Sequence, residues 1–321
     1  MNTYFEEIRN LISETEKNGV LSSIEGLSGY SGKKIIGALQ RFGRFKEMDE
    51  GAGYLEIGVF QGLTLISVAG VLKSAAAIGV DNFSQFDIDG KNRNIVLERI
   101  ARNNIKNAFL INMDFEEALL SLENHLGNAK IGLYFVDGPH DYRSQLLCLE
   151  WIKPYLSERA IIVVDDSNYR HVRQANHDFL INNPSFKLFY EAYTDQHPGT
   201  MDVKKRTAAE DGWWNGVNIL VKDPENELKQ MFPPTMKDKS LYFNEHILHS
   251  SKYAFLAPDA LLFFSCLMNL KLFRAAKLFV KLLIKSNKIP NAYSGRFMRL
   301  NTYSRSLPKG NFNNSYIKKI N

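Results

Sequence analysis

The chain has 321 residues, of which 45% are hydrophobic and 23% charged, a balance that argues against a disordered or fibrous protein. Its two cysteines have no CxxC partner, which argues against a disulfide framework or a structural zinc site and favours a reducing, cytoplasmic setting. No stretch of about 20 uncharged apolar residues exists, so no transmembrane helix is expected, and the N-terminus lacks the apolar core of a signal peptide.

The first 50 residues are expected to form an N-terminal helical segment. Apolar side chains recur at helical spacing at Ile8, Leu11 and Ile12, and again between Ile35 and Phe42. A break that contains glycine and serine lies between the two stretches and divides the segment into two helices.

Residues 51–222 have a different hydrophobic pattern, in which short apolar runs alternate with longer amphipathic ones. Runs that are apolar throughout are typical of strands covered by helices on both faces of a sheet. The alternation predicts a Rossmann-like, doubly wound α/β domain around a mostly parallel seven-stranded sheet. The predicted strands are 54–59, 76–80, 108–111, 131–136, 160–164, 187–192 and 217–221. The predicted helices between them are 63–72, 91–103, 115–122, 142–156 and 171–182.

Residues 223–321 are expected to form a basic, largely helical C-terminal extension, helical at 251–287 and ending in a flexible tail. From residue 260 onward there are twelve Lys or Arg and no Asp or Glu, whereas the preceding part has a net charge of −7. Basic residues between Lys271 and Lys288 recur every three or four positions, which places them on one side of a helix.

Two interpretations of the basic helix remain open. It either packs on the core with a solvated basic edge, or it binds an anionic membrane surface or an anionic glycan precursor. The second interpretation makes the protein peripheral to a membrane. Nucleic acid is disfavoured as a partner, because no nucleic-acid-binding motif accompanies the charge.

The first segment that carries chemistry is the turn after the strand at 54–59. The strand contains Glu56, and Gly58 and Gly62 follow before a helix begins. Glycines let the backbone approach a ligand closely, and a helix start presents free N–H groups. The GxGxxG dinucleotide pattern is absent, and Glu56 would repel a phosphate. A zwitterionic ligand with a cationic sulfonium fits this turn better, while an ordinary tight turn is the alternative.

Acidic residues also follow the next two strands. Asp81 can accept hydrogen bonds from both hydroxyls of a ribose, or it can cap the following helix. Asp114 either binds adenine or caps the helix at 115–122, and capping is the favoured role.

Three further carboxylates follow the strands at 131–136 and 160–164. Asp137, Asp165 and Asp166 are expected to meet at the carboxyl edge of the sheet, where they repel one another unless a cation neutralises them. Oxygen ligands favour a hard ion, so the sequence predicts a magnesium site. The alternative is that Asp137 and Asp165 cap helices while Asp166 is solvated.

Taken together, these segments resemble the class I S-adenosylmethionine-dependent methyltransferases, close to the sugar O-methyltransferases of antibiotic biosynthesis and the cephalosporin hydroxylase-like proteins. The resemblance covers about residues 50–222. The segments that carry it are 56–64, 81, 137–142, 164–166 and the Gly-Trp-Trp-Asn-Gly run at 212–216. It is specific for the fold and the cofactor and weak for the substrate.

The resemblance implies where the cofactor lies. S-adenosylmethionine is expected over Glu56, Gly58 and Gly62, with its ribose on Asp81 and its adenine near Asp114. In metal-dependent members a divalent ion sits on acids that match the three aspartates named above, which implies Mg²⁺ as a second cofactor.

One departure from the family concerns the base. Some relatives carry an acid two positions after the first metal-binding aspartate, and here that position is Pro139, which cannot accept a proton. His140 or Asp141 is therefore the predicted catalytic base. His140 is also compatible with a purely structural role at the start of a helix.

The predicted function is metal-assisted O-methylation of a hydroxyl on a sugar or sugar-like small molecule. The alternative is a non-catalytic or different-chemistry relative that associates with a membrane or polyanion through the C-terminal extension. A homo-oligomer is compatible with these motifs. The long segment 194–214 is expected to act as a substrate lid, with one of Trp213 and Trp214 packing and the other contacting the ligand. His171, His177 and His197 are expected at the surface or in loops.

Overall fold

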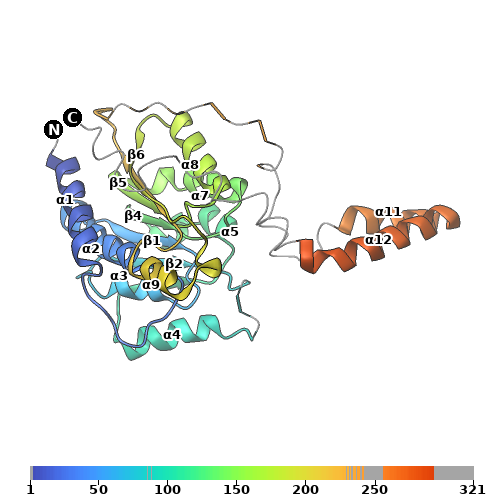
Figure 1. Cartoon of the computed structure of the whole chain (residues 1–321), viewed down its shortest axis with the longest axis horizontal. Helices are drawn as coiled ribbons and strands as arrows, with labels where there is room; N and C mark the ends of the chain where they lie inside the picture. The colour runs from blue at the N-terminus through green and yellow to red at the C-terminus, as the bar shows by residue number, and fades with distance from the viewer. Residues whose placement is uncertain are drawn as a thin grey trace.

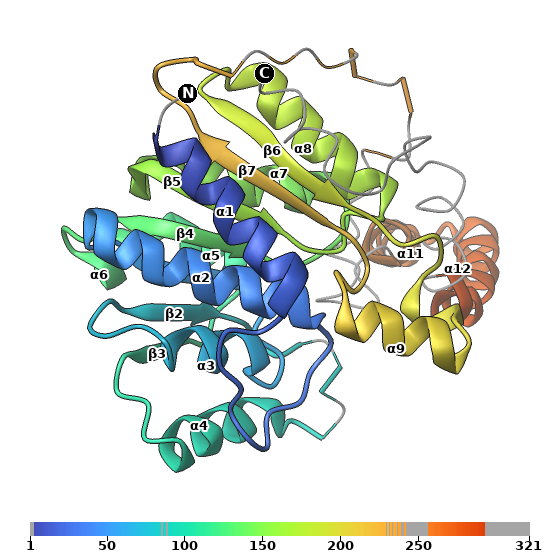
Figure 2. The same cartoon turned by 60° about the vertical axis from the view of Figure 1, so that its left-hand side comes forward.

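The computed structural model describes residues 3–84, 86–87, 89–228, 230, 232, 234–235, 237–238, 241 and 256–292, drawn in two views in Figures 1 and 2. The flexible tail is predicted from Ser286, but residues 286–292 still belong to a helix. The rest of the tail, from residue 293 onward, lies outside the described residues, as does the beginning of the expected helical stretch at 251–255.

A seven-stranded sheet forms the centre of the protein, in the order β3-β2-β1-β4-β5-β7-β6. The strands are β1 (Gly53–Ile57), β2 (Ala77–Val80), β3 (Ala108–Ile111), β4 (Ile131–Val136), β5 (Leu156–Val164), β6 (Phe186–Ala192) and β7 (Val217–Lys222). The first five strands pair in parallel, and β7 runs antiparallel to both of its neighbours. The predicted mostly parallel α/β sheet and its seven strands are confirmed, although β5 begins earlier than expected, at Leu156.

The direction of β7 follows from the path that leads to it. After β6 the chain passes through η2 (Pro198–Thr200) and α9 (Val203–Asp211) and then enters β7 between β5 and β6. It makes no crossover to the other end of the sheet, so the new strand is antiparallel. The predicted lid segment, 194–214, therefore lies at the edge where the parallel strands end.

Helices cover both faces of the sheet (Figure 2). One layer consists of α1 (Thr3–Asn18), α2 (Lys33–Glu50), α3 (Leu63–Ala69) and α4 (Asn92–Arg102). The other consists of α5 (Phe115–Leu120), α6 (Glu123–Leu126), α7 (Tyr142–Trp151), η1 (Lys153–Tyr155) and α8 (Arg170–Asn182). The two N-terminal helices expected in the first 50 residues are thus present and belong to the first layer.

β4 illustrates why the central strands are apolar throughout. Its side chains alternate between the faces, so Leu133 and Phe135 join the core under the first layer while Tyr134 and Val136 join the core under the second. All four are buried. A strand covered on both faces has no solvated position, which explains the continuous apolar run. Each such side chain contributes about 1.5–3 kcal/mol by leaving water.

The C-terminal extension forms a helical hairpin of α11 (Ala257–Met268) and α12 (Leu272–Ala292), which stands apart from the α/β domain in Figure 1. The hairpin has a small core of its own around Cys266, Ala275 and Leu278. In the described part of the chain the basic helix therefore packs on α11, whereas the first of the two interpretations expected it on the core. Within the described ranges, no helix combines the length and apolarity needed to span a bilayer.

Candidate functional site

A cavity of about 660 Å³ lies at the carboxyl ends of β1, β2, β4 and β5. Gly58, Asp81, Asp137 and Asp166, which follow these four strands, all line it. Ligands of open α/β sheets bind at this edge, and the volume is within the range of small-molecule sites.

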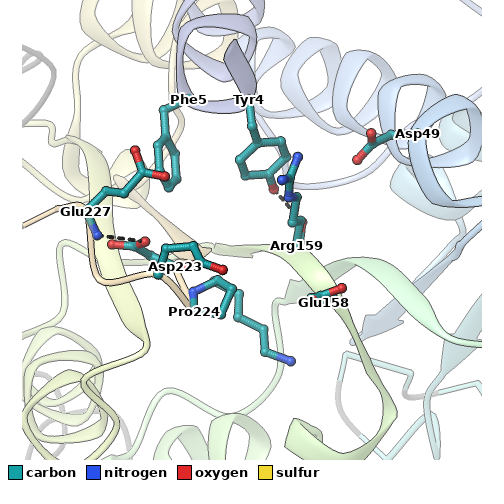
Figure 3. A pocket seen from close by; sticks show the side chains of 10 residues that line it. Tyr4, Phe5, Asp49, Glu158, Arg159, Asp223, Pro224 and Glu227 are labelled. Carbon is teal, nitrogen blue, oxygen red and sulfur yellow. Dashed lines mark hydrogen bonds between the residues drawn. The ribbon is translucent and has the colours of Figure 1, made fainter. Parts of the chain in front are cut away.

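A second cavity, of about 250 Å³, lies at the opposite end of the sheet (Figure 3). It is bounded by Tyr4 and Phe5 of α1, Arg159 of β5, and Asp223 and Glu227 after β7. None of the residues that the sequence singles out lies there. The larger cavity is therefore the candidate site.

Gly58 allows the turn after β1 to lie directly against the turn after β4, beside the larger cavity. Its φ is 90°, and a Cβ at this position would lie 1.9 Å from the carbonyl oxygen of Asp137. Only glycine fits that space, because any other residue would force the turn after β1 away from the turn after β4. Gly62, at φ 81°, is the N-cap of α3 and does not line the cavity.

Asp81 ties the glycine turn to the end of β2. Its Oδ2 accepts hydrogen bonds from the backbone N–H groups of Val59 and Phe60, both at 2.8 Å, and Oδ1 accepts one from Phe83 at 2.7 Å. Asp81 therefore fixes the loop after β1, next to the place where it is predicted to bind the ribose of the cofactor. The alternative of capping α4 is not what the structure shows, since the N-cap there is Lys91.

Asp114 caps α5, as the favoured interpretation expected. Its side chain accepts a hydrogen bond from the backbone N–H of Glu116 at 3.0 Å, and Asn82 donates to its other oxygen at 3.1 Å. Both Asp114 and Asn82 line the cavity. The predicted contact with adenine is compatible with this position.

Glu56 lies outside the cavity, contrary to the prediction that it faces a sulfonium. The side chain is fully buried and accepts a hydrogen bond from Tyr54. Burial raises the pKa of Glu56 to about 8, although the hydrogen bonds from Tyr54 and Thr64 act to lower it. The group is therefore largely neutral at pH 7 and does not supply a negative charge to a ligand.

His140 and Asp166 form the polar pair of the cavity. His140 Nε2 lies 2.8 Å from Asp166 Oδ2, and Asn215 donates a hydrogen bond to the other oxygen. Burial lowers the pKa of His140, but the charge of Asp166 outweighs it and leaves the pKa raised. Burial raises the pKa of Asp166, but His140 and Asn215 outweigh it and leave that pKa lowered.

Three features accompany this pair and help to fix its geometry. The ring of Tyr169 stacks on that of His140 with centroids 5.2 Å apart. Asp166 has a φ of 52°, a left-handed conformation that aspartate adopts more readily than most residues. Its backbone N–H also donates to Oδ1 of Asp165 at 2.8 Å. The arrangement can orient an imidazole for proton transfer.

Asp141, the second predicted base, has a structural role. It is 1% exposed, does not line the cavity, and accepts a hydrogen bond from the backbone N–H of Ser144 as the N-cap of α7. A cap that is buried in this way cannot reach an acceptor in the cavity. Of the two candidates for the base, the structure presents only His140 to the cavity.

The predicted magnesium site is not formed by the side chains as they stand. Asp165 Oδ2 is buried without a hydrogen-bond partner, and burial with neighbouring acids raises the pKa of both Asp137 and Asp165. Asp166, however, is engaged by His140 and Asn215. In the described part of the chain, no group of three or more His, Cys, Asp or Glu side chains is placed to hold an ion.

Aromatic residues form a wall of the cavity, and two of them, Tyr30 and Phe60, are not predicted as site residues from the sequence. Tyr30 stacks on Phe60 with centroids 5.2 Å apart and on Trp214 at 6.4 Å. Trp213 instead is buried, donates to Glu16 at 2.9 Å and packs on Tyr190. Trp213 is thus the tryptophan that packs, and Trp214 lines the cavity, where its contact with a ligand stays a prediction.

Two of the three histidines that the sequence places at the surface or in loops, His171 and His177, instead lie within α8. His171 is 2% exposed, and burial lowers its pKa to about 4. His177 packs on Phe232, and burial likewise lowers its pKa to about 4. His197 does lie in a loop, but that loop forms part of the cavity wall together with Arg206 of α9. No spacing in the sequence indicates that His197 joins the site, because the fold alone brings the lid there.

Comparison with known proteins shows a likeness to one protein family over part of the chain. Residues 55–167 match the family model of a methyltransferase domain. No curated protein sequence matches this chain. Similar solved structures include an O-methyltransferase from Bacillus cereus in complex with SAH, at 15% identity and a TM-score of 0.43 over 70% of this chain and 92% of that one. Another is the O-methyltransferase TomG from Streptomyces achromogenes, involved in tomaymycin synthesis and in complex with SAM, at 14% identity and a TM-score of 0.44 over 68% and 90%. The segment from Leu55 to Ser167, which holds the glycine turn, Asp81, His140 and Asp166, is therefore similar to a methyltransferase domain.

Proposed function

We propose that this chain is an S-adenosylmethionine-dependent methyltransferase that methylates a hydroxyl oxygen of a sugar or sugar-like small molecule. The observation that carries the proposal is the His140–Asp166 pair, 2.8 Å apart in the wall of a cavity of about 660 Å³. The match of residues 55–167 to a methyltransferase domain supports it.

The cavity fits S-adenosylmethionine in the chemistry of its wall. Gly58 leaves the backbone bare where the methionine part is proposed to lie, and the carboxylate of Asp81 is proposed to receive the ribose hydroxyls. Asp114 and Asn82 form the polar wall proposed for adenine. When bound, the cofactor supplies an electrophilic methyl group on a sulfonium.

His140 is the proposed general base. An alcohol is a poor nucleophile near neutral pH, so removal of its proton assists the transfer. We assign the proton to Nδ1 of His140, while Nε2 keeps its hydrogen bond to Asp166. The negative charge of Asp166 then stabilises the imidazolium that forms.

The aromatic wall supports the proposed class of acceptor. Tyr30, Phe60 and Trp214 present stacked rings to the cavity, and such rings pack well against the apolar face of a sugar. Arg206 and His197 of the lid segment add polar groups that can bind hydroxyls.

Calorimetric titration with S-adenosylmethionine and then S-adenosylhomocysteine tests the cofactor. We expect saturable binding of both, and absence of binding by either would overturn the proposal. Transfer of a labelled methyl group to a panel of sugars and sugar nucleotides, with phenols and amines as controls, tests the acceptor class. If only the phenols or amines were methylated, the proposed cofactor would stand and the proposed class of acceptor would be wrong.

Magnesium assistance stays a prediction of the sequence, and its test is direct. The same assay after treatment with EDTA, with and without added Mg²⁺, separates two outcomes. A change under about twofold assigns the proton transfer to the protein's own groups. If EDTA lowers the rate of methyl transfer and added Mg²⁺ restores it, the three aspartates rearrange around the ion.

A further inference from the structure

The α11–α12 hairpin exposes far more apolar surface than a free helical pair in water would be expected to keep. In its described part only Asp259, Cys266, Ala275 and Leu278 are buried. The exposed apolar side chains are Leu261, Leu262, Phe264, Leu267, Met268, Leu270, Leu272, Phe273, Phe279, Val280, Leu283 and Ile284. Apolar side chains exposed in such number on one short hairpin indicate an interaction site.

α12 separates its exposed residues into two faces. At 3.6 residues per turn, Leu272, Phe279, Val280 and Leu283 share the side that carries the apolar surface. A basic edge borders that side and consists of Arg274, Lys277, Lys281 and Lys285, and Lys271 directly precedes the helix. Lys277 also lies over the ring of Phe273, 4.8 Å from its centroid, where the two faces meet.

The turn between the helices is the most exposed apolar part of the hairpin. Met268 is 85% exposed, Leu270 81% and Phe273 78%. Figure 1 shows this turn at the end of the hairpin farthest from the α/β domain. Nothing in the described part of the domain covers it, so the turn is accessible to a large flat partner.

Charge decides between a second copy of the chain and a lipid surface. Asp259 is the only acidic residue between 257 and 292, and Lys281 and Lys285 already bind it. Two hairpins that met through their apolar faces would bring two rows of like charge together without acidic partners. A bilayer with anionic headgroups accepts the apolar face and neutralises the basic edge at once.

We propose that the α11–α12 hairpin binds the surface of a bilayer that contains anionic lipids. The turn at Met268–Phe273 enters the boundary between headgroups and acyl chains, and the helices lie in the plane of the interface. The stems of the lysines pack along the apolar surface while their amino groups reach the phosphates. This binding does not depend on the methyltransferase activity.

Sedimentation of the full chain with vesicles tests the proposal. One set contains phosphatidylcholine alone and the other phosphatidylcholine with phosphatidylglycerol. We expect sedimentation with the second set, weakened by high salt, because salt screens the attraction between lysines and headgroups. Equal binding to both sets, or none to either, would overturn the proposal.

Two variants separate the contributions of charge and of the apolar turn. Lys271→Gln/Arg274→Gln/Lys277→Gln should weaken binding by about a hundredfold, because each basic residue near an anionic surface contributes roughly a factor of five. Lys17→Gln/Lys106→Gln/Lys204→Gln removes the same charge from exposed positions of the α/β domain and should change binding less than about twofold.

Leu270→Asn/Phe273→Ser removes the apolar turn and leaves the charge unchanged. Leu270 has a φ of 57°, which asparagine accepts, so the hairpin should retain its helical circular dichroism. We expect sedimentation to fall by at least tenfold. Sedimentation velocity of the same proteins without lipid supplies the competing outcome. A dimer of the wild type that this variant abolishes, with no binding to vesicles, would assign the surface to a second copy.

Discussion

His140 donates from Nε2 to an aspartate, Asp166, that sits in a left-handed backbone conformation and is itself held by Asn215. The two residues follow different strands, β4 and β5, and meet because those strands are neighbours in the sheet. Because this contact orients the ring of His140 and raises its pKa, His140 is a candidate base.

Removal of the imidazole tests that role. His140→Ala is expected to lower kcat by about 10²–10⁴-fold, which is the usual contribution of a general base. Affinity for S-adenosylhomocysteine should change less than about threefold, because the proposed cofactor contacts lie on the glycine turn and Asp81. Added imidazole should restore part of the rate. A loss of kcat under threefold would assign the proton transfer elsewhere.

The pH dependence of the reaction should report the Asp166 contact. Asp166 raises the pKa of His140, and the base is active only in its neutral form, so the rate of the wild type should rise with pH through that raised value. Asp166→Asn removes the charge, and burial then lowers the pKa of His140. The rising limb of the pH–rate profile should therefore move to lower pH, and its plateau should fall because the imidazolium loses its stabilising charge.

Asparagine suits position 166 because it accepts a positive φ, so a change in fold is not expected. Unchanged circular dichroism would verify that. A profile that keeps its midpoint in the variant would show that Asp166 does not act through His140.

Gly58→Ala should disrupt the turn that is proposed to bind the cofactor. The new Cβ would lie 1.9 Å from the carbonyl oxygen of Asp137, so one of the two turns must move. We expect at least a tenfold loss of affinity for S-adenosylhomocysteine in calorimetry, with a loss of about 1–3 kcal/mol in the free energy of unfolding.

Gly51→Ala is the matched control for that variant. Gly51 has a φ of 60°, but a Cβ at this position would meet nothing within 4 Å, so the variant carries the backbone strain without the clash. It should lower the free energy of unfolding by about 1–2 kcal/mol and leave cofactor affinity intact. Equal losses of affinity in the two variants would mean that global stability, and not the geometry of the turn, governs binding.

The sequence predicts the strands well because burial on both faces leaves a signal that is independent of context. β4, for example, is expected at its observed bounds because all six of its residues are buried and none of them carries a charge. Strand direction leaves no such signal, since the alternation of side chains is the same whichever way a strand runs. The antiparallel course of β7 thus depends on the path through α9, which periodicity does not encode.

The alternation of side chains along β1 accounts for the position of Glu56. Residues two apart in a strand point to the same face, so Glu56 shares the side of Tyr54, which lies in the core under the first layer. The link between His140 and Asp166 had no comparable signal. They are far apart in the sequence, and only the order of β4 and β5 in the sheet and the backbone turn at Asp166 bring them together.

Burial of Glu56 gives a prediction about stability. Its pKa in the folded protein is raised to about 8, so the protonated form is favoured by folding. The stability contributed by this group is complete below its ordinary pKa and is lost as the pH rises toward 8. Glutamine at position 56 cannot ionise, so Glu56→Gln does not lose this stability. The unfolding free energy of the variant minus that of the wild type should therefore rise between pH 5 and pH 8, by on the order of 3 kcal/mol. Urea unfolding at the two pH values measures the difference.

Glu47→Gln serves as a control of opposite sign. Glu47 accepts hydrogen bonds from the backbone N–H groups of Lys73, Ser74 and Ala75, and these lower its pKa although burial acts to raise it. Its ionised form stabilises the fold above its ordinary pKa, and that contribution is lost only as the pH falls through the lowered value. Between pH 5 and pH 8 the cost of Glu47→Gln should therefore not diminish. If both variants responded to pH in the same way, the response would belong to the whole protein and the carboxyl of Glu56 would be ionised in the folded state.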